Sequence, residues 1–181
     1  MKSAALKIVH SKGVTVVEIL ISVVILAIGV LGIEHMLLFS NKANNSSYTK
    51  QQAIQTVNTI FDKIRANSAS AINGDYTISN IGTNGMPTTV STPAAQCNSS
   101  STCTATQLAK YDTWLWLTRD VARLPNGSAS IATALNAATG NTNITVTVQW
   151  DDSPAAQVVG AGTQTNATNT NFVQISIQSA L

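Results

Sequence analysis

The sequence predicts an α+β protein in which a long N-terminal helix packs on a small antiparallel sheet, with one additional helix. Three observations support this fold class. An almost uninterrupted apolar run occupies residues 14–39, an apolar stripe with helical spacing follows it, and alternating apolar and polar residues mark strands in the C-terminal half. The 181 residues suffice for one modest domain.

The charge distribution separates a basic N-terminus from a nearly neutral body. Charged residues make up 10% of the chain, whereas roughly 25% is typical of soluble domains. Three lysines and no acid lie in the first thirteen residues, so the formal net charge of +2 belongs to that segment. A neutral body has little long-range attraction for nucleic acid or anionic lipid. We therefore expect no nucleic-acid partner.

The apolar run predicts a membrane anchor. As a helix, its 26 residues would extend about 39 Å, enough to cross a hydrocarbon core of ~30 Å. The basic flank should stay cytoplasmic, which predicts a single span with the C-terminal body on the far side of the membrane. An ordinary cleaved secretory signal is the alternative, but no A-x-A-like site closes the run, which continues to Leu38.

Glu18 is an acidic residue inside this apolar run. A carboxylate at such a position is costly unless it is paired, which makes it a candidate functional residue. Cleavage after Gly13 would give Val14 an α-amino group that could pair with Glu18 of the same chain or of a neighbouring copy. The alternative is an interfacial glutamate that reaches the lipid head groups.

The segment Lys12-Gly13 followed by Val14 to Glu18 and an apolar helix resembles the class III signal of type IV pilins and pseudopilins. This resemblance implies the type IV pilin fold and a prepilin peptidase that cuts after Gly13 and methylates Val14. It also implies that Glu18 helps to register subunits in a filament. Val14 and His35 depart from the phenylalanine and the proline that are common in this family.

The spine helix of a pilin has a second, amphipathic half, and this chain shows a matching pattern. Ile54, Val57, Phe61 and Ile64 recur at spacings of three and four, and no Pro or Gly occurs between Gly32 and Gly74. An independent helix after a linker at residues 41–49 is the alternative. The predicted domains are a leader (1–13), a transmembrane and assembly helix (14–39), the amphipathic half of the spine helix (40–72) and an α+β head (73–181).

Cys97 and Cys103 lie in a loop rich in Ser, Thr and Asn. Two cysteines in an exported body predict one intramolecular disulfide, which would close a small ring and contribute about 2 kcal/mol. A metal site is the alternative, but two thiols without histidine make a poor zinc centre. We expect no metal and no cofactor.

The C-terminal half shows one helix and several strands, separated by turn residues. The predicted elements are a short strand at 76–81, a helix at 108–124, strands at 128–135, 144–150 and 173–177, a turn at 139–141, and a solvated loop that ends at Asn171.

A narrower resemblance rests on Trp116, on Leu124-Pro125-Asn126-Gly127 and on the segment 144–152. These motifs are similar to those of PilV-type minor pilins, also called type IV pilus modification proteins. The resemblance implies a low-abundance subunit that joins other minor and major pilins, with the inner-membrane assembly machinery, in a complex that primes pilus assembly. The protein would move from the inner membrane to the pilus on the cell surface.

Enzymatic chemistry finds little support. Both histidines, His10 and His35, lie in the leader and the anchor, so the exported body has no histidine to act as a base. Asp151 and Asp152 could be calcium ligands, but a strand-ending turn is the favoured interpretation. Lys110 and two nearby arginines form a weak footprint for DNA. We predict a protein that is not an enzyme.

Three hypotheses follow from these observations. The first is a structural minor pilin. The second is a minor pseudopilin of a type II secretion system, and the third is a single-span anchored adhesin or binding module outside any filament.

Overall fold

The computed structural model describes residues 13–82, 85–98, 102–137, 139–152 and 172–181. The chain divides into two compact units between Asn41 and Lys42. The predicted leader, apart from Gly13, and most of the predicted loop that ends at Asn171 lie outside the described residues.

Helix α1 (Val16–Ala66) is a single α-helix. The polar patch at residues 44–47 has poor helix propensity, yet it is helical here. The hydroxyl of Thr49 donates to the carbonyl oxygen of Asn45 (3.0 Å). The alternative of an independent helix after a linker at residues 41–49 is therefore wrong.

The C-terminal half of α1 supplies one side of the hydrophobic core. Val57, Phe61 and Ile64 are buried as the apolar stripe predicts, but Ile54 remains 38% exposed. The buried face passes instead through Ala53, which lies about 100° around the helix from Ile54. A small residue at this position lets neighbouring elements approach the helix closely.

Two short elements follow α1. The helix stops at Ala66, and a five-residue helix, α2 (Ser68–Ile72), comes after Asn67. The predicted spine helix ran on to residue 72, so the sequence pattern did not indicate the break at Asn67. Strand β1 (Ile78–Ser79) then lies within the predicted short strand at 76–81.

The second long helix begins and ends earlier than predicted. Helix α3 (Ala105–Arg119) starts before Leu108 because Thr104 and Gln107 form a capping box. The 3-10 turn η2 (Val121–Arg123) follows α3. The buried residues of α3 are Ala109, Thr113, Trp116 and Leu117, whereas Leu108 is exposed and Tyr111 and Leu115 are half-buried.

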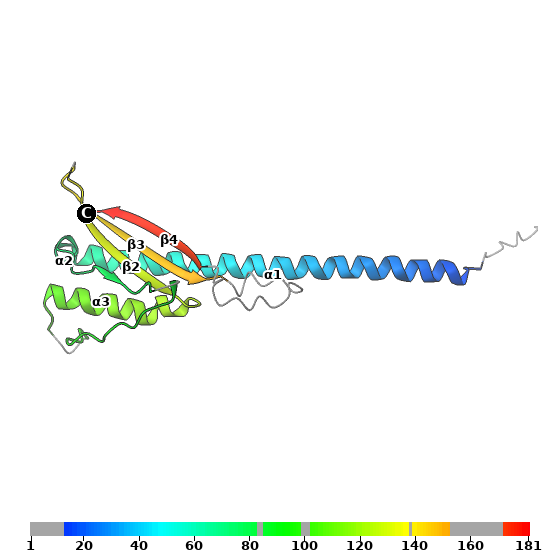
Figure 1. Ribbon diagram of the computed structural model, residues 1–181, viewed down its shortest axis with the longest axis horizontal. Helices are drawn as coiled ribbons and strands as arrows, with labels where there is room; N and C mark the ends of the chain where they lie inside the picture. Colours follow the sequence, from blue (N-terminus) through cyan, green and yellow to red (C-terminus); the bar gives the residue numbers. More distant parts are fainter. Residues whose placement is uncertain (1–12, 83–84, 99–101, 138, 153–171) are drawn as a thin grey trace, which may run out of the picture. The chain divides into compact units, whose positions relative to one another are not determined.

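Strands β2 (Ser128–Leu135), β3 (Thr142–Asp151) and β4 (Phe172–Ala180) complete a four-stranded sheet of order β1-β2-β3-β4. All neighbouring strands are antiparallel. The sheet and α3 both lie alongside the C-terminal half of α1 (Figure 1). The four apolar residues of β3 predicted to alternate are all buried, which gives the expected α+β fold: Ile144, Val146, Val148 and Trp150.

Trp116 joins α3 to α1. Its side chain is fully buried, and its indole Nε1–H donates to the carbonyl oxygen of Thr56 on α1 (2.8 Å). The contact with α1 thus buries the aromatic ring and also gives its N–H a hydrogen-bond acceptor.

We expect Trp116→Ala to lower the free energy of unfolding by about 3–5 kcal/mol, because it leaves a large cavity. Trp116→Phe keeps most of the ring and should cost about 1 kcal/mol through the lost hydrogen bond. Urea unfolding of the full chain in detergent, followed by near-ultraviolet circular dichroism, measures both. Trp114→Phe, at a half-buried position of the same helix, is the control. Equal effects at the two positions would contradict the assigned packing.

Candidate assembly segment and head surface

The N-terminal part of α1 carries an unusually apolar and fully exposed surface. Every described residue from Gly13 to Asn41 is exposed. One described helix, α1, is long and apolar enough to cross a membrane, and its most apolar window has a mean hydropathy of 2.9 with none of that window buried. Exposed apolar surface costs roughly 25 cal/mol per Å² in water, so this segment needs lipid or other helices around it.

The predicted processing and assembly residues lie at the start of this segment. Gly13 and Val14 are exposed and precede the helix, and Glu18 lies in its first turn. The backbone N–H of Glu18 donates to the carbonyl oxygen (3.1 Å) and the hydroxyl (3.3 Å) of Thr15. No ion pair involves Glu18 within the described residues.

The disulfide between Cys97 and Cys103 is formed, with the two Cα atoms 5.8 Å apart. This bond fits the prediction from the sequence. Cys103 immediately precedes Thr104, whose side chain caps the N-terminus of α3. The small ring therefore constrains the chain at the point where α3 begins.

The Leu124 to Gly127 turn is fixed to the end of β3. Asn126 has a φ of 48°, and a Cβ added at Gly127 would lie 2.1 Å from the carbonyl oxygen of Val121. The backbone N–H of Asp151 donates to the carbonyl oxygen of Pro125 (2.8 Å). The Leu124–Gly127 turn and the end of β3 thus hold each other in place.

Asp151 and Asp152 both accept hydrogen bonds from the protein. The side-chain amide of Asn126 donates to Asp151 Oδ2 (3.2 Å), and the hydroxyl of Ser46 on α1 donates to Asp152 Oδ2 (2.9 Å). These bonds favour the strand-ending turn over a calcium site. Across the described ranges, no three His, Cys, Asp or Glu residues lie close enough together to hold a metal ion.

Three polar residues from separate elements form a cluster. These residues are Lys63 of α1, Tyr76 of the segment after α2, and Asp112 of α3. Lys63 Nζ lies 3.1 Å from Asp112 Oδ1, and the Tyr76 hydroxyl lies 3.3 Å from both Asp112 Oδ2 and the Lys63 carbonyl oxygen. Burial, reinforced by the negative charge of Asp112, raises the pKa of Tyr76 to about 12. Sequence reasoning missed this cluster because its members are far apart in the chain.

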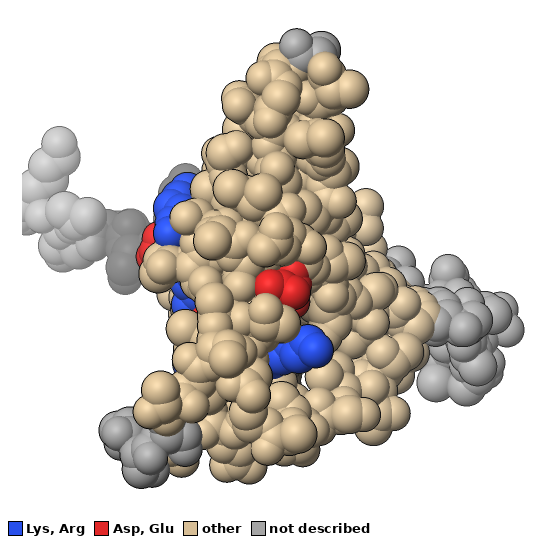
Figure 2. Space-filling view, turned by 90° about the vertical axis from the view of Figure 1, so that its left-hand side faces the viewer, with Lys and Arg blue, Asp and Glu red and all other residues tan. Residues whose placement is uncertain are grey.

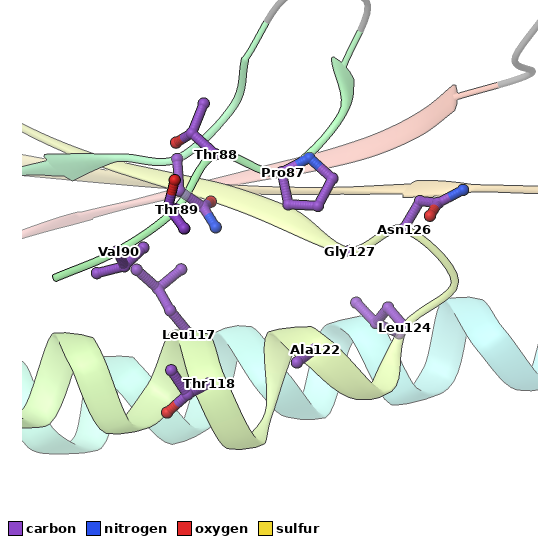
Figure 3. Close-up of a pocket in the computed structure, with 11 residues that line it drawn as sticks. Pro87, Thr88, Thr89, Val90, Leu117, Thr118, Ala122, Leu124, Asn126 and Gly127 are labelled. Carbon is purple, nitrogen blue, oxygen red and sulfur yellow. The ribbon is translucent and has the colours of Figure 1, made fainter. Parts of the chain in front are cut away.

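A cavity of about 520 Å³ lies between α3 and the segment that follows β1 (Figure 3). Leu117, Thr118 and Ala122 line one side, and residues 87–90 line the other. A second hollow, of about 400 Å³, includes Ile72 and Leu135. The side chains that line these two spaces include no ionisable group, so neither space offers a residue for acid–base chemistry.

Charged groups are sparse on the surface as well. Figure 2 shows one face on which Lys, Arg, Asp and Glu form small separate spots among other residues. Arg65, for example, pairs with Asp62 one turn away (3.2 Å). A surface of this kind favours recognition by hydrogen bonds and shape over long-range attraction.

Comparison with known proteins gives one match. A family model described as Tt1218-like, Type IV pilin Tt1218, matches residues 37–114. No curated protein and no solved structure matches the chain. The match supports the predicted type IV pilin superfamily for this chain. It also supports a structural, non-enzymatic role, and the apolar helix fits a membrane-anchored pilin.

We expect the stability of the head to fall as the pH rises from about 10 to about 12. The folded protein holds the Tyr76 proton more tightly than the unfolded chain does. Stability from this group is therefore complete below pH 10 and decreases by at most about 1.4 kcal/mol per pH unit above it. Urea unfolding at several pH values measures the slope. The Tyr76→Phe variant should lack this contribution to the pH dependence of the free energy of unfolding. If stability fell with pH at the same slope in both proteins, Tyr76 would not be the group responsible.

Proposed function

We propose that this chain is a minor pilin, a low-abundance structural subunit that is incorporated into type IV pili or primes their assembly. One observation carries the proposal. The N-terminal part of α1 exposes an apolar surface with Glu18 in its first turn, while the C-terminal part of the same helix is built into the core of the head. A helix with these two surfaces suits a subunit that leaves the membrane to pack against other helices.

Processing would convert this chain from a membrane protein into a subunit. A prepilin peptidase would cut after Gly13 and methylate Val14, and the new amine would be the cation for Glu18. Exposure of Gly13 and Val14 supports access by a peptidase. Gly29 and Gly32 would let neighbouring helices approach closely, since nothing within 4 Å would meet a side chain at either position.

The head supports the minor-pilin part of the proposal. The turn at residues 124–127 and the end of β3 resemble the PilV-type motifs, and the Pro125–Asp151 hydrogen bond connects them. The proposed partners are other minor and major pilins and the inner-membrane assembly machinery. Before assembly the chain would span the inner membrane once, with residues 73–181 as a periplasmic head, and afterwards it would lie on the cell surface.

We expect Glu18→Gln to abolish or strongly reduce incorporation into pili, because it removes the charge that the new N-terminus would meet. Glu34→Gln is a matched control, since Glu34 is also an exposed acid on the apolar part of α1. Immunoblotting of sheared pili against the membrane fraction measures incorporation. If both variants enter pili as well as the natural chain does, the role of Glu18 is refuted.

Mass spectrometry of sheared pili tests the processing. The expected product begins at N-methylated Val14 and is present at low stoichiometry. Replacement of Gly13 by leucine should leave the full-length chain in the inner membrane, whereas Gly29→Ala should be processed normally. A chain that retains its original N-terminus at the cell surface would favour the anchored adhesin. Incorporation into a secretion pseudopilus instead would favour the pseudopilin.

A further inference from the structure

Strand β4 lies at one edge of the sheet. It is the last strand in the order β1-β2-β3-β4. Thr142 of β3 and Leu181 exchange both of their backbone hydrogen bonds (3.2 and 2.9 Å), so the odd-numbered residues of β4 bond to β3. The even-numbered residues direct their N–H and C=O groups away from β3. No backbone hydrogen bond to these groups comes from elsewhere in the described chain.

The usual devices that protect a sheet edge are missing from β4. Its nine residues include no proline and no charged side chain, and its pairing with β3 is continuous, without a bulge. Natural sheets block edges with lysine, proline, bulges or very short strands. The opposite edge of the sheet is formed by a very short strand, because β1 has two residues. An edge strand of this length without these devices is a template for pairing with another strand.

The sequence of β4 matches its own reverse around Ser176. Gln174-Ile175-Ser176-Ile177-Gln178 reads identically in both directions. We propose that β4 pairs antiparallel with β4 of a second copy, with Ser176 opposite Ser176. In this register, even-numbered residues of one copy lie opposite even-numbered residues of the other. The backbone N–H and C=O groups that point away from β3 in each copy therefore meet each other. About ten hydrogen bonds would form, two for each opposed pair.

The side chains are compatible with this pairing. Ile175 and Ile177 pack partly against the hydrophobic core, and the pairing places each of them opposite the other on the second copy. These would be non-hydrogen-bonded pairs, in which side chains lie closest. No like charges face each other across the strands. The contact has two-fold symmetry, so it closes at the dimer.

The direction of β4 determines which copies can meet. Within the unit that begins at Lys42, β4 runs toward the same end as the C-terminal half of α1 (Figure 1). A two-fold axis reverses both elements in the partner, so the two heads approach from opposite directions. The pairing therefore suits copies on separate filaments or cells, and not neighbours in one filament, which point the same way.

Cysteine cross-linking of the full chain in detergent tests the proposal. In the proposed register the two Ser176 Cα atoms lie about 5.5 Å apart, close to the usual spacing in a disulfide. Mild oxidation of Ser176→Cys should give at least about tenfold more covalent dimer than Ala132→Cys, because pairing raises the effective concentration of the thiols. Ala132 is a matched control, exposed on the same sheet face but on the interior strand β2.

Two further variants test the register. Gln174→Cys alone should cross-link poorly, since two copies of this residue would lie about 14 Å apart along the strands. Mixed with Gln178→Cys, it should form the heterodimer. Equal dimer yields at positions 176, 174 and 132 would overturn the proposal.

A charge at the centre of the edge gives an independent measurement. Ser176→Lys should abolish the dimer seen by light scattering in detergent, because two lysines would face each other. Ala132→Lys should leave the dimer intact. A dimer that survives Ser176→Lys would refute the pairing. This inference rests on β4 and not on processing at Gly13, so its failure would leave the pilin proposal unaffected.

Discussion

The packing of the C-terminal half of α1 is the contact on which the rest of the head depends. Val57 and Ile60 are fully buried there, and the Thr56 carbonyl oxygen accepts the indole hydrogen of Trp116. Because hydrophobic burial supplies most of the favourable free energy of folding, removing this helix would leave the sheet and α3 without a common partner. A subunit of this design keeps its head intact only while the helix stays helical.

The turn at residues 124–127 connects the 3-10 turn η2 to β2. Asn126 takes a left-handed conformation that few residues accept readily, and Gly127 leaves no space for a side chain. The hydrogen bond from the backbone N–H of Asp151 to the carbonyl oxygen of Pro125 then fixes the turn against the end of β3. Local backbone constraints, and not chemistry at a binding site, therefore account for the two sequence motifs in this region.

The sequence predicted the elements with strong periodicity and missed those fixed by tertiary contacts. Strand β3 was evident because its apolar residues alternate, and α1 because its apolar run is long. The buried face of α3 was less evident because it includes small residues, Ala109 and Thr113, whereas a larger one, Leu108, remains exposed. Glu18 was identifiable as an isolated acid, whereas the pairing of Lys63 with Asp112 joins residues from separate elements that no spacing connects.

Two kinds of surface on this chain lack partners within the described residues, and they differ in what can satisfy them. The apolar side chains of α1 before Asn41 require only a nonpolar environment, which lipid or many different helices provide. The backbone groups on the outer edge of β4 require donors and acceptors at fixed intervals, so they select a strand in one register. A single subunit can thus combine tolerant packing of its helix with a specific contact at its sheet edge.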